Sequence, residues 1–134
     1  MVFMANEAVC IETPKIFARY TVADATAIAK GTLLKLSGDN TAIASSGGDV
    51  FAGILWEEKT VSDGITEATA ALDGVWDLTT NANTGITLGG IVSLSGANLI
   101  KQATEAEMVT GQAFGKCLET ASASEVVRVR LGFM

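Results

Sequence analysis

The 134-residue sequence predicts an all-β protein: a small β-barrel or sandwich with an internal two-fold repeat, one short helix and an extended N-terminal arm. Three observations predict this class. Apolar and polar residues alternate over short runs, as strands with one buried face require. Turn signals recur about every 8–12 residues, a spacing typical of small sandwiches and barrels. Finally, one segment of the chain is repeated further along it.

The first 27 residues form the predicted N-terminal arm. They contain the chain's single proline, Pro14, and no glycine. Residues 16–22 alternate with period two, which indicates extended chain, and a preceding proline fits an edge or isolated strand because it cannot donate to an interior ladder. We expect this arm to pair with a partner; the alternative is an ordinary first strand of the domain. The contact residues expected in it are Thr13, Pro14, Lys15, Ile16, Phe17, Arg19 and Tyr20.

The repeat defines a predicted barrel domain over residues 28–134, with halves at about 28–80 and 86–134. Residues 28–40 (IAKGTLLKLSGDN) align without a gap on residues 86–98 (ITLGGIVSLSGAN). In both copies a glycine turn leads into a short apolar strand, and Ser-Gly-x-Asn then predicts a hairpin. A second matched block begins at Gly53 in one half and at Gly115 in the other.

One short helix is predicted where the second half carries extra residues. Thr104 and Glu107 have the spacing of a capping box, in which each side chain bonds the other residue's backbone N–H. Gly111 stands where the helix would end.

Composition and charge exclude several function classes. Nine Lys and Arg against 15 Asp and Glu give a net charge of −6, which argues against a nucleic-acid partner. No apolar stretch is long enough to span a membrane. Only 18% of residues are charged although the mean hydropathy is +0.37. A domain of this size cannot hide all its apolar surface, so we expect another chain to cover part of it.

The sequence shows no reaction centre, and we expect no enzyme, no cofactor and no metal site. Histidine, the commonest general base and metal ligand, is absent. Cys10 and Cys117 form no metal-binding spacing and are expected to be reduced thiols. Glu57 and Glu119 are equivalent in the repeat, which leaves a carbohydrate-active or carbohydrate-binding module as a distant alternative.

Several stretches together resemble the head decoration (capsid cement) proteins of tailed phages. They are Ile11-x-Thr13-Pro14, residues 19–28 (RYTVADATAI), residues 30–36 (KGTLLKL), residues 48–54 (GDVFAGI) and residues 111–116 (GQAFGK). The similarity runs from about residue 11 over nearly the whole chain, and no single motif is diagnostic. Such a resemblance implies a compact barrel or tulip-like fold. It also implies a homotrimer on the outer surface of the expanded head, with an N-terminal arm reaching the major capsid protein.

The function expected from this resemblance is capsid decoration: a protein assembled in the host cytoplasm that binds and stabilises the phage head in the virion. A tail-tube or head-completion protein is the structural alternative, and a native mass would separate a trimer from a hexamer or polymer. The sequence leaves the natural start open between Met1 and Met4.

Overall fold

The structure is a computed structural model and describes residues 6–47 and 50–132. Within these ranges the chain forms eleven β-strands and one five-residue α-helix, so the predicted all-β class with one short helix is confirmed. The two candidate start residues, Met1 and Met4, lie outside the described residues.

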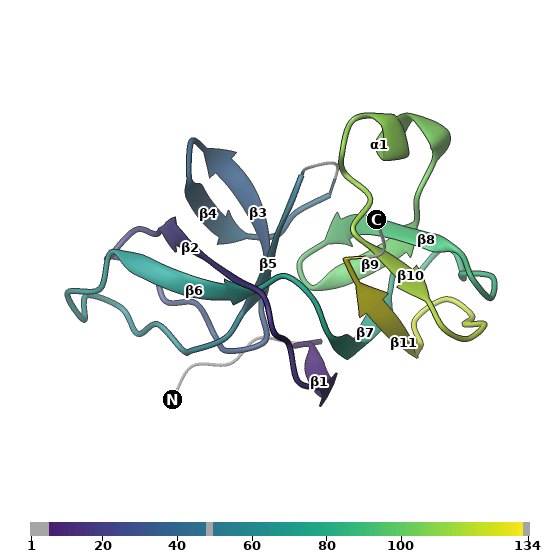
Figure 1. The fold of residues 1–134 in the computed structure, drawn as a ribbon, viewed down its shortest axis with the longest axis horizontal. Coiled ribbons are helices and arrows are strands. Elements are labelled where there is room, and N and C mark those ends of the chain that lie inside the picture. Colours follow the sequence, from purple (N-terminus) through teal and green to yellow (C-terminus); the bar gives the residue numbers. More distant parts are fainter. Residues whose placement is uncertain (1–5, 48–49, 133–134) are drawn as a thin grey trace.

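The strands form two lobes that lie side by side (Figure 1). The first lobe is a closed barrel with the strand order β2-β4-β3-β5-β6. Its strands are β2 (Phe17–Thr21), β3 (Leu33–Gly38), β4 (Thr41–Ala44), β5 (Phe51–Leu55) and β6 (Glu67–Ala71). The second lobe contains β7 (Val75–Thr80), β8 (Ile91–Gly96), β9 (Leu99–Gln102), β10 (Gly115–Cys117) and β11 (Val126–Leu131). The remaining strand, β1 (Val9–Glu12), pairs with β7 of the second lobe.

The two lobes follow the same strand circuit. In the second lobe the order β7-β11-β10-β8-β9 returns to its start through a β7–β9 pairing, just as β2 meets β4 in the first lobe. Loop bridges match as well, since Ile28 bridges Lys59 in the first lobe and Ile86 bridges Ala121 in the second. Each half of the repeat is therefore a complete five-stranded unit.

The observed unit begins earlier in the chain than the predicted one. The sequence patterns predict that residues 17–21 belong to the arm, that the halves start at residues 28 and 86, and that both halves form one barrel. In the structure β2 pairs with β6 along its whole length, so it is the first strand of the first barrel. Correspondingly, β7 opens the second lobe instead of closing the first half. The sequences of β2 (FARYT) and β7 (VWDLTT) share too little for the equivalence to be seen without their pairing partners.

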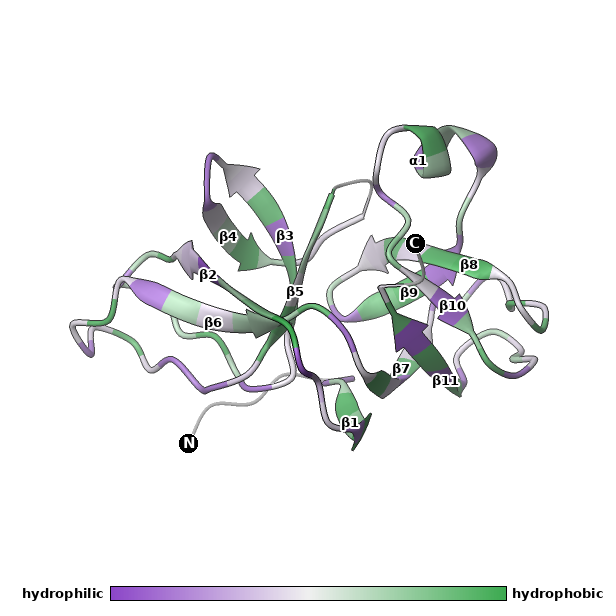
Figure 2. Cartoon of the chain, in the orientation of Figure 1, coloured by the Kyte–Doolittle hydropathy of each residue, from purple (hydrophilic) through white to green (hydrophobic). Residues whose placement is uncertain are grey.

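The cores of the two lobes differ in side-chain size. The first barrel is lined by small residues where the equivalent positions of the second lobe carry large ones: Ala42, Ala52, Ala68 and Ala70 against Ile100, Phe114, Val127 and Val129. The reverse holds at one bridge position, where Lys59 is 1% exposed and its counterpart is Ala121. The buried alkyl chain of Lys59 thus adds volume to the lobe whose other core residues are small. The period-two pattern that the sequence predicted is clear along β11, where exposed and buried residues alternate (Figure 2).

The lobes are joined by a polar and an aromatic contact. Asn98, fully buried, accepts the backbone N–H of Leu33 through its Oδ1 at 2.9 Å. Its own N–H donates to the hydroxyl of Ser45, which in turn donates to the carbonyl of Gly96. The aromatic contact is formed by the rings of Phe51 and Phe114, which stack with their centroids 3.9 Å apart. Apolar residues of both lobes form one continuous cluster across this boundary.

The predicted helix is present as α1 (Glu105–Val109), and the predicted capping box is formed. Thr104 Oγ1 accepts the backbone N–H of Glu107 at 3.2 Å, and Glu107 Oε1 accepts that of Thr104 at 2.9 Å. Lys101 pairs with the other oxygen of Glu107 at 2.9 Å. Although burial alone would raise the pKa of Glu107, these bonds and the nearby ammonium lower it.

Candidate functional site

Residues 9–16 lie against the second lobe and against the turn that joins the lobes. Strand β1 pairs antiparallel with β7, with Val9 opposite Asp77. The next residues are held by Asp73, whose Oδ1 accepts the backbone N–H groups of Lys15 at 2.7 Å and of Ile16 at 2.9 Å. Gly74 has a φ of +99°, and a Cβ there would come within 2.8 Å of the Glu12 carbonyl oxygen. The segment expected to reach outward is thus bound to its own chain over much of its length.

A groove of about 370 Å³ runs between this segment and the end of β11. It is lined by Thr13, Lys15 and Ile16 on one side and by Asp73 and Arg130 among others on the opposite side. Both charge signs and an exposed apolar side chain therefore meet in one concave surface. Three of the seven predicted contact residues contribute to it.

The remaining predicted contact residues have different surroundings. Pro14 is buried. Phe17 and Arg19 point outward from β2: Phe17 is 41% exposed and meets Trp56 edge-on with ring centroids 5.5 Å apart, and the Arg19 side chain is 72% exposed. Tyr20 packs against the core of the first barrel, which raises the pKa of its phenol through burial. The side chains of Phe17 and Arg19 are therefore exposed on the surface, whereas those of Pro14 and Tyr20 are packed against the interior of the protein.

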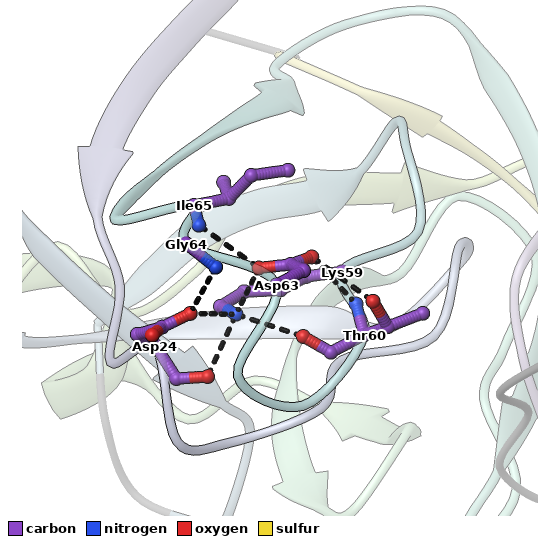
Figure 3. A network of polar contacts seen from close by, with 6 residues as sticks. All are labelled: Asp24, Lys59, Thr60, Asp63, Gly64 and Ile65. Atoms are coloured by element: carbon purple, nitrogen blue, oxygen red, sulfur yellow. Dashed lines mark hydrogen bonds and ion pairs between the residues drawn. The ribbon is translucent and has the colours of Figure 1, made fainter.

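A polar network that the sequence patterns did not reveal links the loop after β2 to the loop after β5 (Figure 3). The buried ammonium of Lys59 donates to Asp63 Oδ1 at 2.9 Å and to the carbonyls of Asp24 and Thr60, each at 2.9 Å. It also lies 3.4 Å from Asp24 Oδ1. The Asp63 carboxylate in turn accepts the backbone N–H groups of Thr60 and Ile65. Every oxygen named here faces one cation, so the network ties the 57–66 loop to the loop after β2.

The charges of this network stabilise each other. Burial alone would lower the pKa of Lys59, but the hydrogen bonds and charges of Asp63 and Asp24 outweigh it and raise that pKa. The hydrogen bond from Lys59, followed by that from the Ile65 backbone, holds the pKa of Asp63 well below its usual range. The Asp63-Gly64 pair lies in a turn, and the Asp63 carboxylate is also the anchor of a buried cation. The period-two pattern of the sequence could not reveal this buried lysine, because Lys59 lies in the loop between β5 and β6 and not in a strand.

The carboxylates considered from sequence are separated by the fold. Glu57 lines a small groove on the first lobe together with Arg19, Glu58 and Glu67, whereas Glu119 is not part of it. Glu119 lies in the second lobe, where its carboxylate accepts the backbone N–H of Arg128 at 3.0 Å. In the described part of the chain, no group of three or more His, Cys, Asp or Glu side chains is arranged to hold a metal ion.

Two further surface features are relevant. Both cysteines are free thiols, Cys10 exposed and Cys117 buried, and burial is the main cause that raises the pKa of each. On the outer face of the second lobe, Lys116 and Arg130 are direct cross-strand neighbours.

No helix within residues 6–47 and 50–132 has the length and apolar character needed to cross a membrane.

Together these features define a protein of two equivalent five-stranded β-units with an N-terminal strand laid on the second. No known family model and no curated protein matches the sequence. Among solved structures, the chain is similar to the gp8.5 N base of the head fiber of bacteriophage phi29, with a TM-score of 0.54 and 12% sequence identity. The match covers 87% of this chain and 95% of that chain. At this identity the likeness shows that the two share a fold.

Proposed function

We propose that this chain is a structural protein of a phage head, which binds the outer surface of the expanded head and stabilises it. The observation that carries the proposal is the shared fold: the gp8.5 N base of a phage head fiber is matched over 95% of its length. The resemblance of the sequence to head decoration proteins supports the same role independently. The proposed location is the capsid surface of the virion, after synthesis in the host cytoplasm.

The proposed mode of action is binding, not catalysis, with the major capsid protein as partner. A protein that binds the expanded lattice more tightly than its disrupted form stabilises the lattice by mass action. As a homotrimer the chain would engage several shell subunits at once, and weak contacts would then add through effective concentration. Exposed side chains of the N-terminal region, Ile16, Phe17 and Arg19, are the proposed contacts.

Adding the purified protein to expanded heads that lack it tests the proposal. We expect saturable binding at micromolar concentration and heads that withstand higher temperature. Ile16→Ser removes an apolar side chain that is 58% exposed and should weaken binding several-fold. Leu88→Ser is the matched control, because Leu88 is 69% exposed but lies in the second lobe, away from the proposed contacts.

The absence of saturable binding would overturn the proposed function. Point variants are preferable to deleting residues 1–20, because that deletion removes β1 and most of β2 and opens the first barrel. Native mass provides a second readout: a hexameric ring or a polymer in place of a trimer would favour the tail-tube or head-completion alternative.

A further inference from the structure

In the described residues, part of one edge of β2 is unpaired, whereas the equivalent edge of β7 in the other lobe is covered. In the second lobe, one edge of β7 pairs with β11, and the opposite edge is covered by two strands. Strand β9 covers Thr79 and Thr80, and β1 covers the half of β7 before them. In the first lobe the equivalent edge of β2 has one paired position, Thr21 opposite Thr41.

Hydrogen bonds fix which backbone groups of β2 face this edge. The Ile16 carbonyl and the Val22 N–H bond toward β6 and the chain beside it, whereas the Thr21 N–H donates to Asn40 on the other side. Because residues two apart in a strand direct their N–H and C=O groups the same way, Phe17 and Arg19 share the direction of Thr21. Among the described residues, no strand pairs with these two positions.

The equivalence of the lobes gives the geometry of an occupant. Phe17 and Arg19 correspond to Val75 and Asp77, the positions that β1 covers in the second lobe. We propose that an extended segment of a partner protein adds to β2 here, antiparallel, as β1 adds to β7. Backbone hydrogen bonds would supply affinity, and side chains next to Phe17 and Arg19 would supply selectivity.

The side chains on β2 specify the chemistry of that segment. In the second lobe Val9 lies opposite Asp77 and Glu12 opposite Val75. In the first lobe the same two places hold a cation, Arg19, and an exposed aromatic ring, Phe17. The matching strand therefore places an acidic residue opposite Arg19 and an apolar residue opposite Phe17.

The occupant is assigned to another protein because the described chain has no strand left to supply. The strand that adds to the equivalent edge in the second lobe, β1, is already paired with β7. A second copy could donate β1 only by breaking that pairing and the hydrogen bonds from Lys15 and Ile16 to Asp73. A shell subunit is the partner if the proposed function holds, but the strand-binding position is argued without it.

A fused strand tests the position without any phage component. The probe is a copy of residues 8–13 joined to the C-terminus of the full chain by a flexible Gly–Ser linker of about 30 residues, which gives an effective concentration in the millimolar range. In the test fusion the added copy carries Cys10→Ser, Val9→Glu and Glu12→Val. In the control fusion the copy carries Cys10→Ser alone, which places a valine opposite Arg19 and a glutamate opposite Phe17. Amide hydrogen exchange is measured at Phe17 and Arg19 by NMR.

We expect both amides to exchange at least about ten-fold more slowly in the test fusion than in the control fusion. Arg19→Pro in the test fusion should abolish the protection of Phe17 yet leave the fold intact, because the N–H it removes points away from β6. Arg19→Thr keeps that N–H and should lose only part of the protection. Equal exchange in the two fusions would overturn the proposal. Concentration-dependent protection in the unfused protein would also overturn it, since the occupant would then be a second copy.

Discussion

The carboxylate of Asp73 accepts the backbone N–H of Ile16 at 2.9 Å, and the backbone N–H of the preceding residue, Leu72, donates to the Ile16 carbonyl. Both backbone groups of residue 16 are therefore held by residues 72 and 73, just before the first barrel begins. This contact determines where the side chains of the N-terminal segment stand. A partner that binds this segment, as proposed above, would meet Ile16 and Phe17 in a preset position, which would lower the entropic cost of binding them.

Replacing Asp73 should loosen this segment. Asp73→Ala removes the acceptor of two backbone N–H groups, and we expect a loss of about 1–2 kcal/mol in the free energy of unfolding. Denaturant unfolding measures the loss, and faster amide exchange at Lys15 and Ile16 locates it. Asp73→Asn retains one acceptor oxygen, so its free energy of unfolding should lie between those of the wild type and Asp73→Ala. Unchanged exchange at both amides in Asp73→Ala would show that the segment is held by β1 alone.

The junction between the lobes can be tested with a control built into the repeat. Asn98→Ala removes the buried acceptor of the Leu33 N–H and should destabilise the protein by about 1–3 kcal/mol beyond any backbone effect. Asn40 is the equivalent hairpin residue, with a φ of +51° against +57° for Asn98, but it is exposed. Asn40→Ala therefore carries the same backbone strain without the lost contact. Equal stability of the two variants would show that the hydrogen bond between the lobes contributes nothing.

Local patterns in the sequence were sufficient to predict the repeat, the hairpins and the helix. The Ser-Gly-x-Asn turns need a residue that tolerates positive φ, and both Asn40 and Asn98 adopt it. The capping box of Thr104 and Glu107 is likewise formed between residues three apart. Turns and helix caps form between residues close together in the sequence, so the local sequence is enough to predict them.

The features that the sequence did not reveal depend on pairing between distant segments. The place of β2 in the first barrel requires β6, some fifty residues further along. The hydrogen bonds from residues 15 and 16 to Asp73 also join segments far apart in the sequence, and they accompany the pairing of β1 with β7. For the candidate site, sequence identified the exposed Ile16, Phe17 and Arg19 but could not separate them from Pro14 and Tyr20, which face inward.

The buried lysine gives a prediction that separates packing from charge. Lys59→Met keeps most of the alkyl volume and leaves the carboxylates their backbone N–H partners, so we expect a small fall in Tm. Lys59→Ala also leaves a cavity and should lower Tm further. Asp63→Ala leaves the ammonium with fewer acceptors and frees the 57–66 loop, and should lower Tm by about 5–10 °C. Calorimetry of the three variants measures the order; a Met variant as unstable as the Ala variant would assign the role of Lys59 to its charge.

The same network predicts a pH window for stability. The pKa of Asp63 in the folded protein lies below its unfolded value of about 3.9, so its contribution is complete above about pH 4 and is lost as pH falls toward the folded pKa. The pKa of Lys59 is raised, so its contribution is complete below about pH 10 and is lost as pH rises through the folded value. The Tm difference between the wild type and Asp63→Asn should therefore stay level from pH 5 to 8 and shrink below pH 4. Asp39→Asn, at an exposed hairpin position, is the matched control and should show little difference across that range. A difference for Asp63→Asn that persists undiminished at pH 2 would contradict a role for the ionised pair.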